Sequence, residues 1–324
     1  MNKEAKIYVA GHRGLVGSAI LKELTSKGFI HIVTRTSTEL DLRSQKATTE
    51  FFQSEKPDYV FLAAAKVGGI MANSTYKADF IYDNILIAAN VIKAAADTGV
   101  KKLLNLGSSC IYPKLAPQPL KEEYLLSDKL EPTNEPYAVA KIAAIKMCTA
   151  FNEQYGTNFI SAMPTNLYGP GDNFDLNTSH VLPAMVRKFH EAKLSGKPVR
   201  LWGDGSPMRE FLYSEDLAAG LIFLMESVDA GDMSEGFINI GTGEDVTIRH
   251  LAEMIADIIG YKGKVEWDTS KPNGTPRKVM DVSRIKELGW TASTGLEEGI
   301  RLVYEWYCQQ KEMIEVSGVV FVRP

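Results

Sequence analysis

The sequence has almost no excess of charge of either sign. Among its 324 residues, 36 lysines and arginines stand against 40 aspartates and glutamates, which leaves a formal net charge of -4. A protein without a strong positive field does not attract nucleic acid or an anionic membrane surface over long range. The composition therefore excludes those two classes of partner, and any anionic ligand has to be bound at a local site.

Long hydrophobic segments are also missing. The longest apolar run, residues 217–225, is far shorter than the roughly 20 residues that a membrane-spanning helix needs. Residues 1–6 are too polar for a secretory signal. With 45% hydrophobic and 23% charged residues, the composition is that of a globular protein, which we expect in the cytoplasm.

Cysteine is scarce, since the chain has only Cys110, Cys148 and Cys308. An odd number of widely separated cysteines does not form a disulfide framework. We expect three reduced thiols, of which Cys148 and Cys308 are interpreted as packing residues. We also predict no metal site.

The sequence does contain a regular alternation of β-rich runs and amphipathic helical stretches. This alternation is typical of a parallel sheet with helices on both faces. Because crossovers are right-handed, it predicts an α/β fold with a Rossmann-like doubly wound sheet, whose ligands lie at the carboxyl ends of the strands. The expected strands are residues 6–10, 30–35, 58–63, 102–107 and 158–164, and the expected helices are residues 14–26, 76–98 and 136–155.

A glycine-rich segment follows the first expected strand and opens the first helix. It reads Gly11-His12-Arg13-Gly14-Leu15-Val16-Gly17. Free backbone N–H groups at the start of a helix bind a pyrophosphate, and glycine lets the phosphates approach the backbone. The spacing differs from the usual Gly-x-Gly-x-x-Gly fingerprint, and the alternative is a plain tight turn. The strand before it and the helix after it favour a dinucleotide site.

Arg35 ends the next expected strand, where an NAD-specific fold usually has an acidic residue for the ribose 2′-hydroxyl. Together with Arg13 it indicates a 2′-phosphate and therefore NADP, although a solvated surface arginine is the alternative. Asp41 can accept a hydrogen bond from the adenine amino group, or it can be an ordinary turn residue.

Glycine and proline become more frequent after Thr165, which suits a smaller, loop-rich part that closes over a ligand. We therefore expect an NADP-binding domain in residues 1–165, with a returning segment at about 211–246. Residues 166–210 and 247–324 are expected to form a smaller α/β substrate-binding part.

Tyr137 and Lys141 lie one helical turn apart, so their side chains share one face. A nearby ammonium lowers the pKa of a phenol and makes it useful in acid–base catalysis. Such pairs also occur by chance. Ser108 follows the expected strand 102–107, so its hydroxyl can bind the same substrate carbonyl as the tyrosine, which favours a catalytic interpretation.

The glycine loop, Ser108 and the Tyr137-x-x-x-Lys141 pair together resemble the extended short-chain dehydrogenase/reductases that act on nucleotide sugars. Segments 11–18, 107–114, 131–137 and 163–170 narrow the resemblance to the branch that makes GDP-L-fucose, and it extends over residues 7–306. The resemblance implies an oxidoreductase and isomerase. It would convert GDP-4-keto-6-deoxy-D-mannose to GDP-L-fucose by inverting carbons 3 and 5 and then reducing the ketone at carbon 4 with NADPH.

This pair of reactions needs more than a reductase site. Protons on the carbons beside a ketone become acidic when the enolate oxygen is stabilised, a role that suits Tyr137 and Ser108. A separate base and acid are also needed. Cys110 lies two residues after Ser108, on the same side if the segment is extended, and its thiol pKa shifts readily toward neutrality. His180 titrates near pH 7.

Taken alone, Cys110 would be interpreted as a buried hydrophobe and His180 as a loop residue. The resemblance implies instead that Cys110 is the acid–base cysteine and His180 the acid–base histidine of the family. Which of them serves which carbon stays open.

The resemblance also implies the ligand contacts. Lys141 would hold the nicotinamide ribose, and further cofactor contacts would come from Leu42, Leu106, Pro164, Asn166, Leu167 and His180. The GDP-sugar would contact Arg187, Lys188, Trp202, Arg209 and Asn273. Three positions depart from the pattern, because Lys188 replaces a common arginine, Asn273 a common aspartate, and Ser37 a second arginine for the 2′-phosphate.

Two other functions are compatible with parts of this pattern. A nucleotide-sugar 4-epimerase or dehydratase of the same fold would keep Tyr137 and Lys141 but has no need of Cys110 and His180. A non-catalytic NADP-binding sensor would have no reason to keep Tyr137, Lys141 and Ser108 together. The helices at 76–98 and 136–155 favour a homodimer, the alternative being burial against the sheet. The tail at 312–324 is assigned no function.

Overall fold

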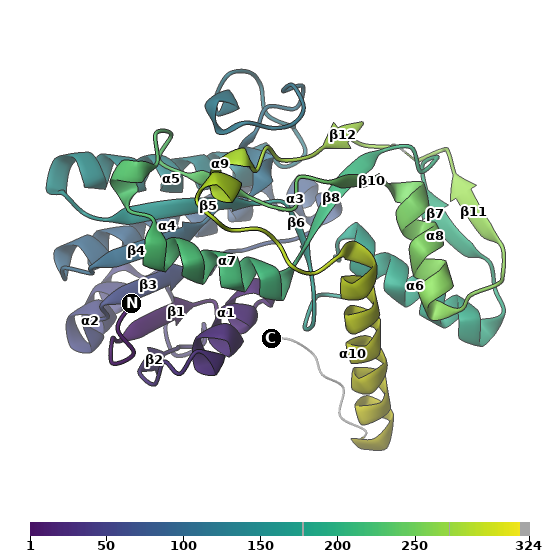
Figure 1. Cartoon of the computed structure of the whole chain (residues 1–324), viewed down its shortest axis with the longest axis horizontal. Helices are drawn as coiled ribbons and strands as arrows, with labels where there is room; N and C mark the ends of the chain where they lie inside the picture. The colour runs from purple at the N-terminus through teal and green to yellow at the C-terminus, as the bar shows by residue number, and fades with distance from the viewer. Residues whose placement is uncertain (177, 272, 318–324) are drawn as a thin grey trace.

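The structure is a computed structural model that describes residues 1–176, 178–271 and 273–317. Its larger part is a parallel sheet in the order β2-β1-β3-β4-β5-β9 (Figure 1). These strands are β1 (Ile7–Ala10), β2 (Ile32–Val33), β3 (Tyr59–Leu62), β4 (Lys102–Leu106), β5 (Phe159–Pro164) and β9 (Ile238–Ile240). Nearly every position of the central strands is buried, as expected for parallel strands that are covered on both faces. The Rossmann-like doubly wound sheet is thereby confirmed.

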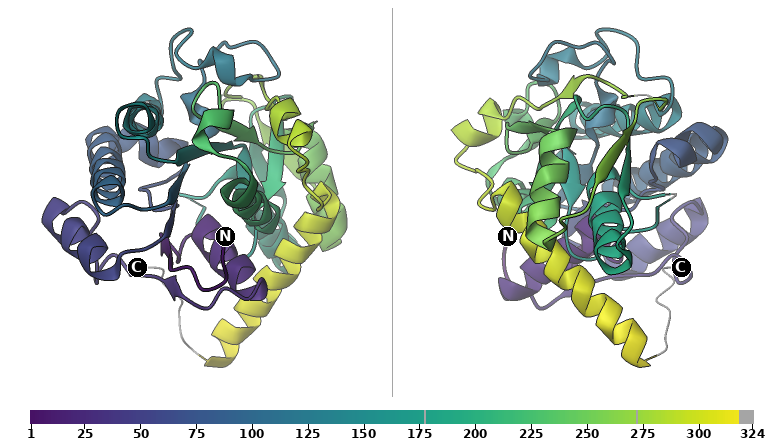
Figure 2. Two further views of the ribbon diagram at one scale, coloured as in Figure 1. Left: turned by 60° about the vertical axis from the view of Figure 1, so that its left-hand side comes forward. Right: turned by 90° about the vertical axis from the view of Figure 1, so that its right-hand side faces the viewer.

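Helices cover both faces of this sheet, as the two side views show (Figure 2). On one face, α1 (Leu15–Ser26) packs against α7 (Ser214–Ser227). The other face carries α2 (Gln45–Glu55), α4 (Lys77–Asp97) and α5 (Glu135–Tyr155). Both α7 and β9 come from the chain segment 211–246, so this late part of the sequence lies with the large sheet.

One local prediction was wrong, and one helix was missed. The sequence predicts a strand over residues 30–35, but β2 has only two residues because the segment lies at the sheet edge, with Ile30 exposed. Helix α2 was not predicted, because it is polar and buries little more than Phe51 and Phe52. Those two rings pack against Tyr8 of β1, so tertiary contact rather than a strong hydrophobic period stabilises this helix.

The second part of the molecule is built around β8 (Met208–Tyr213). This strand pairs with β6 (Asn166–Tyr168), β10 (Asp245–Thr247) and β12 (Arg277–Lys278). Beside it, β7 (Val199–Trp202) pairs with β11 (Val265–Asp268). A separate hydrophobic core joins these strands to α6 (Val181–Ser195), α8 (Ile248–Ile259) and α10 (Leu296–Ser317), and the far end of α10 projects from the body (Figure 1).

The remaining elements are short. They are α3 (Ile70–Thr75), α9 (Ser283–Glu287) and the 3-10 helices Ser109–Ile111, Glu122–Tyr124 and Ala230–Asp232. In the described ranges, no helix combines the length and apolarity that crossing a membrane requires. The predicted tail falls partly outside the described residues, from 318 onward.

The junction between the two sheets places the site. Strand β5 ends at Pro164 and β6 begins at Asn166, so the chain passes directly from the carboxyl edge of the large sheet into the small one. The junction therefore lies at the carboxyl edge of the large sheet, where parallel-sheet folds bind ligands.

Candidate active site

The glycine loop has the geometry of a phosphate cradle. Gly11 has a φ of +83°, and a Cβ there would lie 2.7 Å from the backbone nitrogen of Ala64. A Cβ on Gly17 would lie 2.1 Å from the Gly11 carbonyl oxygen. Side chains at these positions would separate β1, α1 and the end of β3, so glycine is required.

The start of α1 is open to an anion. Its N-cap residue Gly14 has no side chain to cap the helix, and the first turn has no acidic residue. The buried Nδ1 of His12 has no hydrogen-bond partner in the described part of the chain. Unsatisfied N–H groups at a positive helix end fit the pyrophosphate of a dinucleotide, so the residues present are compatible with such a cofactor.

Arg35 is held at the edge of this cradle by α2. Its Nη2 donates to Oε1 of Glu55 over 2.6 Å, and its guanidinium lies 5.5 Å from the centre of the Phe51 ring. Asp41 accepts hydrogen bonds from Nε and Nη2 of Arg43 and from its backbone N–H. Asp41 is thus a turn residue that is already paired, and its predicted contact with adenine stays a prediction.

Ser108, Tyr137 and Lys141 converge as predicted. Nζ of Lys141 donates to the carbonyl of Leu106, the last residue of β4, over 2.8 Å and lies 5.7 Å from the centre of the Tyr137 ring. Tyr137 also forms a hydrogen bond with the hydroxyl of Ser108. A phenol, a serine hydroxyl and an ammonium group thereby gather where β4 ends and α5 begins.

The pKa predicted for Tyr137 was wrong in direction. A lowered value was expected from the nearby ammonium, but burial raises the pKa of Tyr137 far above its usual range, although the bond with Ser108 opposes this shift. Burial also lowers the pKa of Lys141 to about 8. Desolvation disfavours the charged form of both groups and is the largest cause of each shift. Tyr137 is therefore a protonated phenol at neutral pH, suited to donate a proton.

Cys110 lies beside this group, but not in the extended backbone that was expected. Residues Ser109–Ile111 form a 3-10 helix, capped by the Ser108 hydroxyl, which accepts from the Cys110 backbone N–H over 3.4 Å. Burial raises the pKa of the Cys110 thiol, opposite to the predicted shift toward neutrality. The positive charges of Lys278 and Lys141 act in the other direction and support a thiolate.

His180 is the N-cap residue of α6, at the end of a loop that contacts another loop across the site. The backbone N–H of Gly69 donates to the carbonyl of Thr178, and a Cβ on Gly69 would lie 3.2 Å from the carbonyl oxygen of Ser179, which is a tight contact. Burial lowers the pKa of His180, so its imidazole is neutral at pH 7. In the described residues it makes no hydrogen bond to Cys110 or Tyr137.

The small sheet contributes a pair of cations, one of which the sequence analysis missed. Arg209 of β8 and Lys278 of β12 are paired in register. Burial lowers the pKa of both side chains. No described residue forms a hydrogen bond or ion pair with Lys278 Nζ, and the guanidinium of Arg209 donates only to its neighbour's carbonyl. Glu131 acts on Lys278 only through its charge and is itself paired with Lys114. Two partly buried cations to which no described carboxylate is bonded form a site for an anion.

The other predicted substrate residues lie in different situations. Arg187 is occupied by Glu191 over 2.7 Å and by the Phe174 carbonyl. Lys188 donates to the Arg200 carbonyl. Trp202 at the end of β7 is 59% exposed, and its ring is available for stacking.

Asn273 accepts a hydrogen bond from the backbone N–H of Asp204 over 2.9 Å. A Cβ on Gly203 would lie 2.2 Å from the same Asn273 oxygen, so this asparagine fixes the loop that follows Trp202. Of the further cofactor contacts implied by resemblance, Leu106 and Pro164 end β4 and β5, and Asn166 and Leu167 begin β6. Leu42 is buried, and His180 is the N-cap residue of α6.

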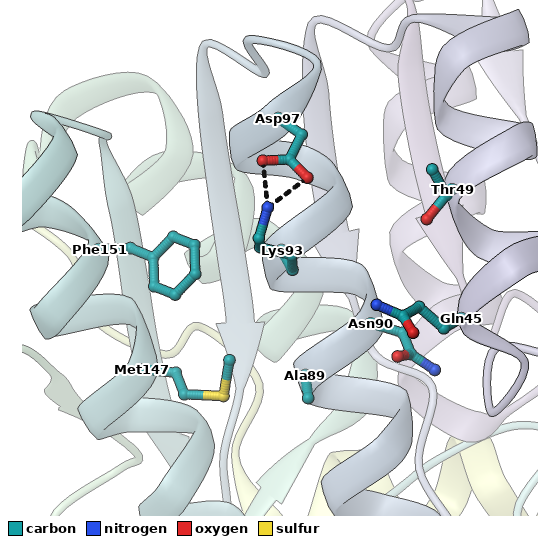
Figure 3. Close-up of a pocket in the computed structure, with 8 residues that line it drawn as sticks. All are labelled: Gln45, Thr49, Ala89, Asn90, Lys93, Asp97, Met147 and Phe151. Atoms are coloured by element: carbon teal, nitrogen blue, oxygen red, sulfur yellow. Dashed lines mark hydrogen bonds and ion pairs between the residues drawn. The ribbon is translucent and has the colours of Figure 1, made fainter.

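A pocket of about 300 Å³ lies elsewhere, between α2, α4 and α5 (Figure 3). Figure 3 shows Gln45 and Thr49 of α2 facing Asn90 of α4, with the Lys93–Asp97 ion pair exposed beside them. None of the predicted site residues lines this pocket. The chemistry therefore belongs to the sheet junction and not to this outer groove.

The pKa of Lys141 leads to a stability prediction. Replacing Lys141→Met removes the buried ammonium. Between pH 8 and 10.5 the unfolded wild type keeps a proton on this lysine that the folded protein releases, so folding becomes more favourable as pH rises. We expect the free energy of unfolding of wild type, relative to the variant, to increase by up to about 3 kcal/mol over this range. Denaturant unfolding at a series of pH values measures it, and a constant difference would contradict the assignment.

Comparison with known proteins agrees with this geometry. GDP-L-fucose synthase 1 of Arabidopsis thaliana is 56% identical over 307 residues, covering 94% of each chain. GDP-L-fucose synthase of Escherichia coli is 53% identical over 318 residues, covering 96% of this chain and 99% of the relative. A solved GDP-mannoheptose C4 reductase from Campylobacter jejuni, with NADP bound, is 43% identical with a TM-score of 0.89, covering 95% of this chain and 99% of that one. Residues 7–241 match the NAD dependent epimerase/dehydratase family, and the chain belongs to that family.

Proposed function

We propose that this protein converts GDP-4-keto-6-deoxy-D-mannose to GDP-L-fucose with NADPH, inverting carbons 3 and 5 before reducing the ketone at carbon 4. The observation that carries the proposal is the position of Cys110. Its backbone and thiol lie against Ser108, which also bonds Tyr137. A group that exchanges protons on carbon thus lies beside the groups that bind and protonate a ketone oxygen, as the two reactions in one site require.

The first stage is proton exchange at the carbons beside the ketone. The hydroxyls of Ser108 and Tyr137 donate hydrogen bonds to the ketone oxygen and stabilise the enolate that forms. Cys110, as its thiolate, removes a proton from one face of the sugar, and the imidazolium form of His180, whose lowered pKa makes it a stronger acid, returns one to the opposite face. Both groups regain their starting protonation by exchanging protons with water. The positive charges of Lys278 and Lys141 support the thiolate against the effect of burial, so a larger share of the thiol is ionised and able to accept a proton.

The second stage is reduction. NADPH, when bound, supplies the hydride. Tyr137 gives its proton to the oxygen at carbon 4, which its raised pKa suits because the phenol stays protonated at neutral pH. Lys141 orients the end of β4 through its bond to the Leu106 carbonyl and contacts the nicotinamide ribose.

The nucleotide is held by the small sheet. Arg209 and Lys278 bind the diphosphate, because they are adjacent cations with no acidic partner among the described residues. Trp202 stacks on the guanine, and Asn273 holds the loop behind it. Lys188 contributes a further positive charge, whereas Arg187 is committed to Glu191.

NADP is the proposed form of the cofactor. Arg35 lies at the ribose end of the cradle with Arg13 in the loop before it, and both are positively charged groups within reach of Glu39. Glu55 fixes the direction of the Arg35 side chain. In this arrangement the glycine loop binds the pyrophosphate and the two arginines bind the 2′-phosphate. Residues 1–165 with the returning segment 211–246 form the cofactor-binding domain.

We further propose a homodimer in the cytoplasm. Helices α4 and α5 pack side by side and leave Tyr82, Ile85 and Val139 exposed. Two such helix pairs bury these apolar side chains by forming a four-helix bundle. Sedimentation equilibrium tests the dimer, and a monomer at micromolar concentration would contradict it.

The function is tested by following deuterium. The protein is incubated with GDP-4-keto-6-deoxy-D-mannose and NADPH in deuterium oxide, and the product is analysed by NMR. We expect GDP-L-fucose with deuterium at carbons 3 and 5, since both protons exchange with solvent through the enolate. Reduction without exchange would mean a C4 reductase, like the Campylobacter relative, and would refute the epimerase part.

The cofactor preference is tested by Arg35→Ala. Loss of a charged contact to the 2′-phosphate weakens NADPH binding, whereas NADH has no group for it to touch. We expect the ratio of kcat/KM for NADPH over NADH to fall about tenfold or more. Lys46→Ala is the matched control, because Lys46 is an exposed lysine of helix α2, the helix that also holds Arg35 through Glu55. An unchanged ratio in Arg35→Ala would remove this residue from cofactor selection.

The role of Cys110 is tested by Cys110→Ser. A hydroxyl is a much weaker base than a thiol near neutral pH, so the variant should bind NADPH normally but release sugar that is reduced with incomplete epimerisation. Cys148→Ser is the control, because that thiol is buried in the core beneath α5. If both variants give product of the same stereochemistry as wild type, Cys110 is not the base.

A further inference from the structure

Glu210 is a buried carboxylate with no role in the reaction described above. It lies in β8 and is 0% exposed. Its Oε1 accepts hydrogen bonds from the backbone N–H groups of Thr242 (2.6 Å) and Gly243 (2.9 Å), and its Oε2 accepts one from Met280 (2.7 Å). Burial raises the pKa of this carboxyl, and the N–H donors oppose that effect.

The partners of this carboxylate are all neutral in the described part of the chain. They are backbone N–H groups and threonine hydroxyls, and no lysine or arginine there neutralises it. Hydrogen bonds from N–H groups to a charged acceptor are among the stronger ones, and each also fixes the position of a backbone segment. Glu210 therefore ties the turn between β9 and β10 and the chain after β12 to the middle of β8.

The fit around the carboxylate is close. A Cβ on Gly241 would lie 2.1 Å from Oε1 of Glu210, so the β9–β10 turn approaches the carboxylate as nearly as a backbone can. The main-chain carbonyl of Glu210 also accepts a hydrogen bond from Nδ2 of Asn166 over 2.8 Å. One residue thus contacts both the sugar-nucleotide side and the cofactor side of the junction.

The two free cations are positioned by the same strands. Arg209 directly precedes Glu210, and side chains alternate along a strand, so Arg209 points to the opposite face. Lys278 is in register with Arg209 on β12, and its side chain lies on the same face. Met280, whose N–H binds Glu210, follows Lys278 on the chain. The carboxylate beneath the sheet therefore holds together the two strands that carry the cations above it.

Like charges on adjacent strands repel one another, and the positive Arg209 disfavours a positive Lys278. β12 is only two residues long and has few ladder bonds of its own. We propose that Glu210 is a positioning residue, which fixes the spacing of Arg209 and Lys278 so that both cations are ready to bind the diphosphate of a GDP-sugar. This inference rests on the function proposed above.

The test is the binding of GDP and of NADPH, each measured by isothermal titration calorimetry, to wild type and Glu210→Gln. The glutamine amide has the same shape as the carboxylate, but its NH2 group cannot accept a hydrogen bond. It therefore faces the backbone N–H groups on one side without bonding them, which loosens β12. We expect the Kd for GDP to rise at least about tenfold. The Kd for NADPH should change less than about twofold, because the link from Glu210 to the cofactor side is the hydrogen bond from Asn166 to its main-chain carbonyl, which the substitution leaves in place.

Asp245→Asn is the matched control. Asp245 is opposite Glu210 in the β10–β8 ladder and pairs with Arg277 of β12, so it also links β10 to β12, but through the exposed Arg277 side chain. We expect this variant to bind GDP like wild type. Glu210→Asp keeps the charge but is shorter, and we expect it to weaken GDP binding less than Glu210→Gln does.

The outcomes separate the two proposals. Wild-type protein that binds neither GDP nor inorganic pyrophosphate would refute the proposed function itself. Wild type that binds GDP, with Glu210→Gln binding it equally well, would refute only the positioning role. Equal loss of GDP and NADPH binding in both Glu210 variants, or their failure to fold, would show that Glu210 merely supports the fold and would also overturn the inference.

Discussion

The removal of water from charged groups at the sheet junction is the constraint on which this site depends. Burial raises the pKa of Tyr137 and of Cys110 and lowers the pKa of Lys141 and of Lys278. Each shift favours the uncharged form and weakens the folded state relative to a site open to water. The same exclusion of water strengthens the electrostatic interactions with a developing enolate. The cost in stability and the catalytic advantage therefore have one origin.

The parts of the fold and site that the sequence predicted are those with local signals. A glycine loop between a strand and a helix, and a tyrosine and lysine one turn apart, are visible in a short window because their geometry is set by one element. The 3-10 turn at Cys110 was missed, since it depends on how the Ser108 hydroxyl caps the following residues. Helix α2 was missed because its burial comes from rings on another element.

Lys278 shows why the rest could not be predicted. In sequence it is one of two adjacent basic residues after a proline, and such pairs are usually solvated. Its role depends on a strand pairing that places it beside Arg209, and on its electrostatic effect on Cys110, which lies in the 3-10 helix after β4. No periodicity or residue spacing in the sequence signals either the strand pairing or the effect on Cys110. Only the folded structure therefore distinguishes this lysine from a surface charge.

The two binding functions of the molecule are joined through a small number of backbone contacts. Asn166 lies two residues after the end of β5 and donates a hydrogen bond to the main-chain carbonyl of Glu210, whose carboxylate in turn holds the segment after β12. A displacement of β12 would therefore change the distance between Arg209 and Lys278. It would also strain the hydrogen bond from Asn166 to the main-chain carbonyl of Glu210. Cofactor and sugar nucleotide must meet with their reacting carbons in contact, and a junction connected in this way keeps the two half-sites in one geometry.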